Sequence, residues 1–544
     1  MSKPASSPLT NDHRLVILAS SLGTVFEWYD FFIFGTLAVF FSKSFFPAGD
    51  ATAAFLSSLA LFGVGFSVRP FGALVFGRIG DLVGRKYTFL VTIVVMGFST
   101  ALIGLLPTYA TIGFWAPVIL VVLRLAQGLA LGGEYGGAAT YVAEHAPKGK
   151  RGAYTSWIQT TASLGLFLSL IVIGGLRWGM SKEAFAAWGW RLPFLFSFVL
   201  LALSVFIRLK LEESPVYTQM KAEGKGSKAP LTDSFGNWKN AKIVLIALFG
   251  ATMGQGVVWY AGQFYALYFL TTTLNVDYIS AYTMIAMALA LGAALMLFFG
   301  WLSDRIGRKK IIMTGFLLTV LTYQPIFHAL TRAANPALAT AIETAPVVLS
   351  TAEYQGTGAR VMNALSEAGK KIIFPASAAT SDTAKARAFL FGRGVPFILE
   401  PAKPGAPLTL SVGSETTTGF DAKVYTAYLA AQGYPTAADP RQINEPLTIA
   451  LLTLLLMYVA MVYGPIAAFL VELFPTNIRY TSMSLPYHIG NGWFGGFLPL
   501  IAASIAVSTG DIYSGLWYPI IVAGGCFVIG LIFLPETKDR DLTA

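Results

Sequence analysis

Charged side chains stand in the middle of several long apolar stretches of this chain. Glu27 and Asp30 lie three residues apart in FEWYDFFIFG, near the middle of the apolar run 15–41. A spacing of three places both carboxylates on nearly one face of a helix. Ionisable groups inside a membrane-length helix are costly, which favours a functional role for them. Each carboxylate is therefore a candidate proton carrier, and a buried ion pair with a neighbouring helix is the alternative.

Two arginines in later apolar runs are candidates for binding an anionic substrate. Arg69 stands in SVRPFGALVFG, and its long side chain could extend towards the membrane surface. For Arg69, a structural acidic partner and a substrate contact are equally good interpretations. Arg124 begins RLAQGLALGGEYGGA, and its planar fork of donors matches a carboxylate. A permanent pair with Glu27 or Asp30 is the competing interpretation for Arg124.

The stretch after Arg124 adds polar side chains to the same side of the helix. Gln127 follows Arg124 by three residues and Tyr135 by eleven, spacings that return to one helical face. Glu134 follows Gln127 by seven residues on that side, and it is a third candidate for carrying a proton. We expect Gln127 and Tyr135 to contact the substrate beside Arg124.

The apolar run 242–270 presents a face of aromatic rings and amides. Its members recur at helical spacing and are Gln255, Trp259, Tyr260 and Gln263. An aromatic stripe alone is more often packing, but the two glutamines favour contact with substrate. Later in the chain, His488 and Asn491 lie three residues apart; His488 is a proton-relay candidate or a packed residue, and we favour packing slightly.

The elements that carry these residues must be membrane-spanning helices. The chain has 544 residues, of which 55% are hydrophobic and 12% charged, whereas a typical soluble domain has about 25% charged residues. A helix needs about 20 apolar residues to cross the hydrocarbon core. Twelve runs approach this length: 15–41, 52–77, 88–106, 115–141, 154–175, 191–209, 242–270, 279–301, 310–330, 447–470, 482–508 and 516–534.

A repeated ten-residue stretch divides the chain into two similar halves. GRIGDLVGRK begins at Gly77 and GWLSDRIGRK begins at Gly300, and each lies between two of the apolar runs. Internal repeats at a fixed offset indicate repeated architecture. The spans therefore form two halves of six, joined by a linker.

The basic residues predict the orientation. Loops on the side of the termini hold 22 Lys and Arg, and the short opposite loops hold four. Lys and Arg accumulate in cytoplasmic loops, so we expect both termini and both repeated hairpins in the cytoplasm. The net charge of +10 is then a signature of topology, and nucleic acid is not expected as a partner.

Residues 331–446 interrupt the second half between the ninth and tenth spans. This polar segment holds ten Lys or Arg and nine Asp or Glu. Strand-like runs alternate with helix-like runs, which favours a small α/β extracytoplasmic insert; a mobile loop is the alternative. The expected strands are Pro346–Ser350, Lys371–Pro375, Val395–Leu399 and Leu408–Val412, and the expected helices are Gly358–Gly369, Ala384–Phe391 and Ala422–Gln432. No spacing of a metal or nucleotide site appears, so we expect neither a metal nor a cofactor.

These boundaries divide the chain into five parts. They are the N-terminal six-helix bundle 1–209, a cytoplasmic linker 210–241, three helices of the C-terminal bundle 242–330, the insert 331–446, and the last three helices with a cytoplasmic tail 447–544.

The quoted motifs together resemble the metabolite:H⁺ symporter branch of the major facilitator superfamily. They are FEWYDFFIFG, RPFG, RxxQGxxxGGE, LEESP at Leu211–Pro215, ELFPTNIR at Glu472–Arg479 and LPET at Leu534–Thr537, with the two hairpins. The branch includes carriers of shikimate, 2-oxoglutarate, citrate and proline/betaine. The resemblance covers nearly all of the chain except 331–446, where the family usually has no insert.

The resemblance implies an all-α polytopic fold of twelve transmembrane helices in two bundles, with a substrate site between them. It also implies a cytoplasmic gate formed by Asp81 and Arg85 in the first hairpin and by Asp304 and Arg308 in the second. The intramembrane acids Glu27, Asp30 and Glu134 would couple transport to protons.

We therefore expect a transporter of the inner membrane and no enzyme. The expected activity is proton symport of a small organic acid or zwitterion, whose anionic group Arg69 and Arg124 would bind. We expect a monomer as the transporting unit. A facilitative or sodium-driven carrier of sugars or osmolytes is the first alternative. A non-transporting membrane sensor, whose insert binds a ligand, is the second.

Overall fold

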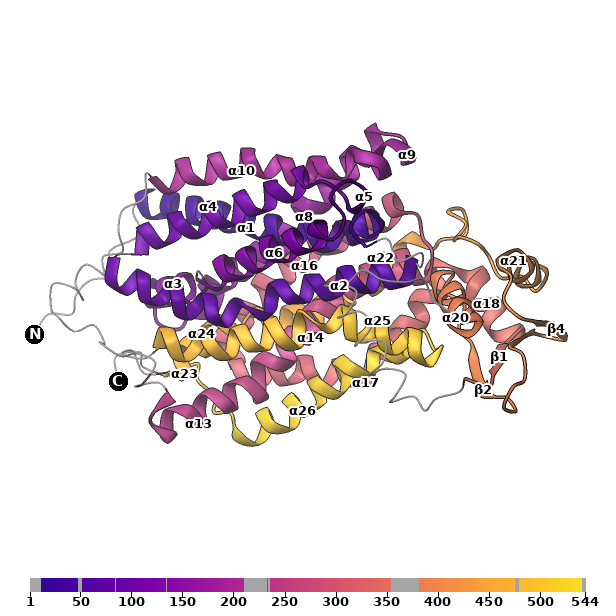
Figure 1. Cartoon of the computed structure of the whole chain (residues 1–544). Helices are drawn as coiled ribbons and strands as arrows, with labels where there is room; N and C mark the ends of the chain where they lie inside the picture. Colours follow the sequence, from indigo (N-terminus) through magenta and orange to yellow (C-terminus); the bar gives the residue numbers. More distant parts are fainter. Residues whose placement is uncertain are drawn as a thin grey trace, which may run out of the picture.

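The computed structural model describes residues 11–46, 51–83, 85–133, 135–209, 232, 235–353, 381–474 and 479–540. For 11–22, 51–56, 77–89 and some further positions, the description covers the backbone alone. Within these ranges the chain is mostly helical, and Figure 1 shows the long helices running side by side.

The first half contains helices over each of its six predicted spans. They are α1 (Asn11–Phe45), α2 (Ala51–Ser67), α3 (Arg69–Val83), α4 (Arg85–Leu105), α5 (Tyr109–Ile112), α6 (Trp115–Gly132), α7 (Tyr135–His145), α8 (Arg151–Gly179), α9 (Lys182–Ala184), the π-helix η1 (Phe185–Gly189) and α10 (Arg191–Leu209). Two predicted spans are each split into two helices. The run 52–77 becomes α2 and α3, and the run 115–141 becomes α6 and α7.

The second half begins with a long helix that contains three π-helical segments. Its parts are α13 (Trp238–Ala247), η2 (Leu248–Thr252), α14 (Met253–Tyr260), η3 (Ala261–Tyr265), α15 (Ala266–Tyr268) and η4 (Phe269–Thr273). Single π turns inside α-helices are rare and occur often at functional sites. They lie in the run that carries the predicted substrate-binding glutamines.

The remaining helices of the second half follow on both sides of the insert. They are α16 (Tyr278–Ile306), α17 (Arg308–Ala334), α22 (Glu445–Tyr463), α23 (Ile466–Leu473), α24 (Arg479–Ile489), the π-helix η5 (Gly490–Gly495), α25 (Leu498–Thr509), the 3₁₀ turn η6 (Ser514–Leu516) and α26 (Trp517–Phe533).

Nine helices of the described chain are long and apolar enough to cross a membrane, or ten if the bent pair Lys182–Gly189 and Arg191–Phe206 is one span. Leu90–Leu105 is a shorter apolar helix. The all-helical membrane fold is confirmed, whereas the count of twelve spans stays a prediction.

Two glycines of α6 allow the helices that carry the candidate arginines to pack closely. A methyl group on Gly128 would collide with the carbonyl oxygen of Gly65, and one on Gly132 would collide with that of Arg69. Glycines four residues apart let membrane helices approach at the backbone. This contact between α6 and α2–α3 places the helix of Arg124 directly against the helix of Arg69.

The described part of the insert contains a four-stranded sheet with helices, and three of its strands overlap expected ones. Its elements are α18 (Pro336–Thr344), β1 (Val347–Thr351), α20 (Asp382–Gly392), β2 (Ile398–Pro401), β3 (Thr409–Val412), β4 (Glu415–Thr418) and α21 (Ala422–Ala431). The strand order is β2-β1-β3-β4, with β1 parallel to β2 and antiparallel to β3. The expected elements Gly358–Gly369 and Lys371–Pro375 lie outside the described residues, and β4 was not anticipated.

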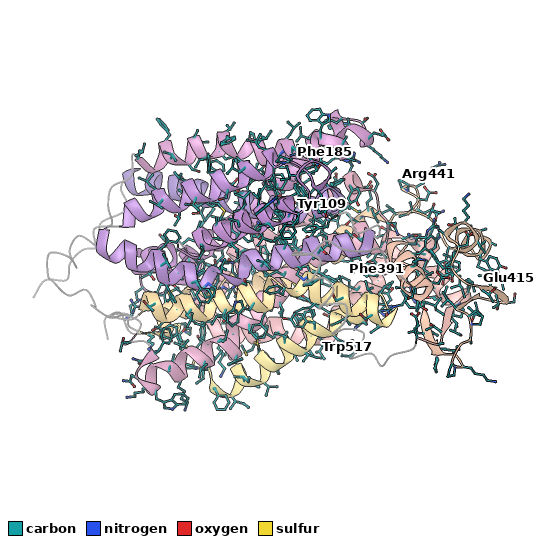
Figure 2. All side chains as sticks on the ribbon, viewed as in Figure 1. Tyr109, Phe185, Phe391, Glu415, Arg441 and Trp517 are labelled. Atoms are coloured by element: carbon teal, nitrogen blue, oxygen red, sulfur yellow. The ribbon has the colours of Figure 1, made fainter. Side chains whose placement is uncertain are left out.

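The insert forms hydrogen bonds with the second half. Phe397 N donates to Gly510 O over 2.9 Å, and Ala438 N donates to Asn275 O over 3.1 Å. Inside the insert, Tyr434 donates to Ala345 O over 2.8 Å. Burial raises the pKa of Tyr434 to about 12, so its hydroxyl stays protonated in the physiological range. The sheet and its helices stand at one end of the bundle (Figure 1), and Figure 2 shows Glu415 and Arg441 on that part.

A cysteine at Ser414 is expected to test the predicted side of the insert. Ser414 is exposed beside β4, so Ser414→Cys should react with a membrane-impermeant maleimide in intact spheroplasts. The buried Cys526 serves as the internal unreactive thiol. Labelling that appears only after permeabilisation would reverse the predicted topology.

Candidate transport site between the two halves

Arg69, the first residue of α3, is a deeply buried cation that lies close to residues of both halves. Its side chain is 1% exposed, and its guanidinium carbon lies 5.4 Å from the Trp28 ring and 5.2 Å from the Phe66 ring. Within the described residues, its Nε and Nη2 atoms have no hydrogen-bond partner, and no carboxylate lies within 4.0 Å. The side chain therefore neither extends to water nor pairs with a described acid.

Tyrosines from both halves surround Arg69. The rings of Tyr135 on α7 and Tyr487 on α24 are parallel, with centroids 3.6 Å apart. The hydroxyls of Tyr487 and Tyr463 are 2.9 Å apart, and Gln159 Nε2 donates to Tyr135 Oη over 2.8 Å. Tyr487 is also within hydrogen-bonding reach of Arg69. The described contacts of Tyr135 place it near Arg69, whereas the sequence placed it on the helical face of Arg124; its contact with substrate stays a prediction.

Arg124 lies in an aromatic setting inside the first half. Its guanidinium carbon is 4.3 Å from the ring centroids of both Phe31 and Phe34. Its Nη1 donates to Gln127 Oε1 over 2.6 Å, and Gln127 Nε2 donates to Thr100 Oγ1 over 2.6 Å. Cation–π contacts and an amide hydrogen bond can hold a buried guanidinium without an ion pair. The predicted proximity of Gln127 to Arg124 is observed.

The two acids of α1 are buried, and neither is seen within 4.0 Å of Arg124 in the described residues. Glu27 and Asp30 are each 4% exposed. Asp30 lies close to Ser197 of α10, and Thr100 Oγ1 approaches the Asp30 carbonyl oxygen at 3.5 Å. The Oδ1 atom of Asp30 has no hydrogen-bond partner among the described residues. The alternative of a permanent Arg124 pair with these acids therefore has no support in this conformation.

The amides and rings of α14 and η3 differ in their surroundings. Gln255 exchanges two hydrogen bonds with Asn491, over 3.0 and 2.8 Å, so its amide is already occupied. Trp259 stacks on Phe32 of α1 with centroids 5.2 Å apart. Both amide atoms of Gln263, which is 1% exposed, lack a partner in the described part of the chain.

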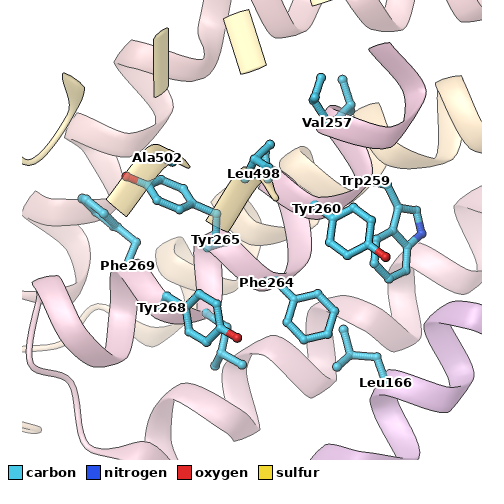
Figure 3. Close-up of a cluster of buried hydrophobic side chains, with 14 of the residues drawn as sticks. Leu166, Val257, Trp259, Tyr260, Phe264, Tyr265, Tyr268, Phe269, Leu498 and Ala502 are labelled. Atoms are coloured by element: carbon cyan, nitrogen blue, oxygen red, sulfur yellow. The ribbon is translucent and has the colours of Figure 1, made fainter. Parts of the chain in front are cut away.

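Tyr260 belongs to an aromatic cluster that joins the halves. Its ring lies 5.2 Å from that of Phe66 and 5.9 Å from that of Phe264. Figure 3 shows Trp259, Tyr260 and Phe264 with Leu166 of the first half beside them. The cluster packs α14 and η3 against α1 and α2, so these aromatic residues line the contact between the halves.

The end of the bundle that holds the second hairpin is closed by a network of charges. Asp304 accepts hydrogen bonds from the backbone amides of Gly152 and Ala153, each over 2.8 Å. Arg308 lies 2.7 Å from Asp304 and 3.1 Å from Glu472. Gly152 and Ala153 begin α8 of the first half, where amides and helix dipole favour an anion. The two halves are therefore joined at this end through Asp304.

The opposite end is also closed, by neutral hydrogen bonds. Tyr268 Oη donates to Gly35 O over 2.6 Å, and Tyr282 Oη donates to Thr36 O over 2.7 Å. These bonds join α15 and α16 of the second half to α1 of the first half. Arg69 and Arg124 are thus buried between two closed ends.

Three predicted residues cannot be placed. Glu134 and the side chains of Asp81 and Arg85 lie outside the described residues. Their roles in proton coupling and gating stay predictions.

Sequence reasoning missed several members of these networks. Arg151 lies 3.5 Å from Glu472, and Glu536 accepts from the backbone amide of Arg308 over 2.8 Å. Glu472 and Glu536 stand in ELFPTNIR and LPET, so their motifs were available as a signal. Tyr463 and Tyr487 carry no comparable signal, because a tyrosine in an apolar run resembles ordinary packing.

Asp304→Asn is expected to favour opening at this end and to slow turnover. The substitution keeps the shape but removes the charge that Arg308 and the α8 amides bind, so the closed state loses charge-assisted hydrogen bonds. Cysteine accessibility at the buried position Ser156 of α8 should rise several-fold in the variant. Transport should slow more than substrate binding weakens.

Asp277→Asn is the matched control, because the partly exposed Asp277 caps α16 by accepting from Ile279 N over 3.0 Å and pairs with Lys182 at 3.5 Å, away from the Asp304 network. That variant should leave accessibility and turnover unchanged. Equal turnover in the wild type and Asp304→Asn would contradict a gating role for Asp304.

The amino-acid sequence matches the family model described as "Sugar (and other) transporter" over residues 15–246 and 419–544. The matched ranges cover more than half of the chain. The unmatched part contains α14 to α17 and most of the insert.

Transporters of small metabolites are similar to the chain. The shikimate transporter of Escherichia coli (strain K12) is 37% identical over 320 residues, which cover 58% of this chain and 72% of that protein. A proline/betaine transporter of Salmonella typhimurium is 36% identical over 329 residues, covering 58% of this chain and 64% of that protein. A putative metabolite transport protein of Haemophilus influenzae is 30% identical over 538 residues, covering 98% of this chain and 96% of that protein. The last similarity includes the insert.

Solved structures of a xylose transporter share the fold. The proton:xylose symporter XylE bound to 6-bromo-6-deoxy-D-glucose superposes with a TM-score of 0.61 over 97% of both chains, at 15% identity. This likeness concerns the fold, and it agrees with the predicted arrangement of helices.

Proposed function

This chain belongs to the sugar (and other) transporter family of the major facilitator superfamily, and from this premise we propose that it carries a small carboxylate-bearing metabolite together with protons. It is a membrane transporter of metabolites and not an enzyme. Substrate would bind between the halves and reach either side of the membrane by alternating access.

The buried guanidinium of Arg69 is the main support for the proposal. Its Nε and Nη2 atoms form the side of the guanidinium that binds a carboxylate through two parallel hydrogen bonds, and both are unpartnered in the described structure. A buried charge without a counter-ion is costly, so an anionic substrate would offset that cost. A neutral sugar would leave the charge unpaired, and for this reason we place carboxylates ahead of sugars.

Tyr135 and Tyr487 support the same assignment. They lie on opposite halves and stack on each other beside Arg69, so a substrate bound to Arg69 would contact both halves. Contact with both halves is what a carrier needs, because the substrate must be released when the halves move apart on one side.

Proton coupling would use the acids of α1. A carboxyl group in a low-dielectric setting favours its protonated form, and a nearby arginine favours the ionised form. The hydrogen bonds Arg124–Gln127–Thr100 lead from a guanidinium towards the backbone of Asp30. A change in the position of Arg124 would therefore alter the surroundings of Asp30, which we propose as the first proton carrier, with Glu27 and Glu134 as the others.

Purified protein in proteoliposomes tests the proposal. Uptake of labelled carboxylates, betaines and sugars should be measured under an inward proton gradient, an inward sodium gradient, and no gradient. We expect accumulation of a carboxylate under the proton gradient only, with loss of accumulation after a protonophore.

Each alternative has a separate outcome. Accumulation driven by the sodium gradient would show that sodium, and not the proton, is the coupling ion. Uptake that only equilibrates the substrate across the membrane would indicate a facilitative carrier. Absence of flux for every compound, with retained binding to the insert, would favour the sensor.

A further inference from the structure

Two buried polar residues of α24 have no described hydrogen-bond partners. Ser484 and His488 are four residues apart, so their side chains leave the helix on the same face. Ser484 is 3% exposed and His488 is 0% exposed. In the described residues, the Ser484 hydroxyl and both ring nitrogens of His488 are unpartnered. Buried polar atoms are normally hydrogen-bonded, so three unpartnered atoms on one helix face point to a ligand.

This face of α24 lies beside Arg69. The His488 ring stands edge-on to the rings of Tyr135, at 6.4 Å, and of Tyr487, at 5.4 Å. Tyr487 is within hydrogen-bonding reach of Arg69, and Arg69 interacts electrostatically with His488. Because α24 packs against α3, His488 and Arg69 belong to one region between the halves, and Ser484 lies one helical turn before His488 on α24.

The local helix geometry also singles out this position. His488 is the next-to-last residue of α24, and the π-helix η5 begins at Gly490. A π segment changes the direction of side chains relative to the preceding turns and is frequent at binding sites. Gly490 packs directly on the backbone of Thr252, which fixes the end of α24 against the second half.

We propose that Arg69, Ser484 and His488 form one subsite for a carboxylate that also carries a hydroxyl or oxo group. This inference rests on the proposed function. The side of the Arg69 guanidinium would bind the carboxylate, while His488 and Ser484 would bind the neutral oxygen. A neutral imidazole offers one donor and one acceptor, and a serine hydroxyl offers both, which complements a substrate hydroxyl.

Two other classes fit this subsite less well. A quaternary ammonium group needs open aromatic faces, but Trp259 stacks on Phe32 and Tyr135 stacks on Tyr487. A dicarboxylate needs a second available cation, but the Arg124 guanidinium lies close to two phenylalanine rings, and its Nη1 and Nη2 donate to Gln127 Oε1 and Phe62 O. Only its Nε lacks a described partner, which is too little for a bidentate carboxylate contact. The groups of α24 that lack a described partner, the His488 ring nitrogens and the Ser484 hydroxyl, are polar side chains that can be neutral.

Matched pairs of carboxylates with and without hydroxyl groups test the inference on the full-length protein. The pairs are shikimate with 1-cyclohexene-1-carboxylate, lactate with propionate, and malate with succinate; glycine betaine represents the quaternary ammonium class. Binding is measured by tryptophan fluorescence of the purified protein, and exchange is measured in proteoliposomes. In at least one pair, the hydroxylated member should bind the wild type about tenfold more tightly.

Two variants of α24 test whether its side chains cause this preference for the hydroxylated member. His488→Phe and Ser484→Ala should each reduce the preference by roughly 3- to 10-fold, the range expected for one hydrogen bond. Affinity for the member without the hydroxyl should change little, because Arg69 still binds its carboxylate. His328→Phe is the control, since His328 stacks on Tyr513 in another part of the fold and should leave all affinities unchanged.

The outcomes separate this inference from the proposed function. Carboxylate binding that depends on Arg69 but shows no hydroxyl preference, or a preference that survives His488→Phe and Ser484→Ala, would overturn the subsite and leave the function standing. Tighter binding of glycine betaine would also overturn it. No binding of any carboxylate would overturn both.

Discussion

Arg69→Gln is expected to weaken binding of the carboxylate substrate by about 100-fold or more. Each charge-assisted hydrogen bond contributes roughly 1.5–3 kcal/mol, and about 1.4 kcal/mol corresponds to a tenfold change in affinity. The side of the Arg69 guanidinium can form two such bonds. Arg69→Lys should recover only part of the loss, because an ammonium group is a point charge without the planar fork.

The thermal stability of the unliganded protein provides an independent measurement. Since no described carboxylate is paired with Arg69, Arg69→Gln leaves no described acid without its partner, and we expect the Tm to be unchanged or raised. Arg308→Gln is the matched contrast, because it removes the cation that pairs with both Asp304 and Glu472 and should lower the Tm by several degrees. Unchanged substrate affinity in Arg69→Gln would remove Arg69 from the site and would transfer the role to Arg124.

Arg124→Lys distinguishes the two arginines. Its cation–π contacts with Phe31 and Phe34 and its bond to Gln127 predict that lysine would disturb the first half as well as any substrate contact. If Arg124 pairs with an acid in another conformation, neutralising Glu27 or Asp30 in the same chain should restore transport.

Asp30→Asn is expected to abolish accumulation against a gradient while exchange of labelled for unlabelled substrate persists. Asparagine keeps the size of the buried side chain but cannot bind and release a proton. Exchange needs no net proton movement, so the substrate site can still alternate. The two assays, run on the same proteoliposomes, therefore separate loss of coupling from loss of the carrier.

Glu27→Gln and Glu134→Gln complete this test. If one of these variants loses accumulation and Asp30→Asn does not, the substituted residue is the proton carrier instead of Asp30. Asp277→Asn is the control, because that partly exposed acid lies outside the candidate site, so the variant should leave both activities intact. If all three variants still accumulate substrate in response to a pH gradient, these acids do not couple the protons, and a sodium gradient becomes the first alternative.

The architecture was predictable because its signals are local in the sequence. Apolar length indicates a span wherever it occurs, and the second hairpin, with Asp304 and Arg308, repeats the first. The strands β1 and β3 also appear near their expected positions, since alternating burial follows a two-residue period. Breaks such as the one between α6 and α7 were not predictable, because they depend on neighbouring helices.

Candidate residues of the site could be recognised individually for a related reason. A charge in an apolar run is unusual whatever its partners, so Glu27, Asp30, Arg69 and Arg124 were identified from their positions alone. The resemblance placed Asp304 and Arg308 together in one hairpin, and the described structure contains their ion pair beside hydrogen bonds from the α8 amides to Asp304.

The partners of these residues were decided by the tertiary structure. In the packed structure Arg124 lies close to the rings of Phe31 and Phe34 instead of a described acid. Tyr463 and Tyr487 lie near Arg69 only because the halves meet there. The same contact places His488, which the sequence favoured as a packed residue, beside a cation. Such contacts join residues hundreds of positions apart in the sequence. Their geometry depends on how helices of the two halves pack together, and the spacing of residues along one helix does not predict that packing.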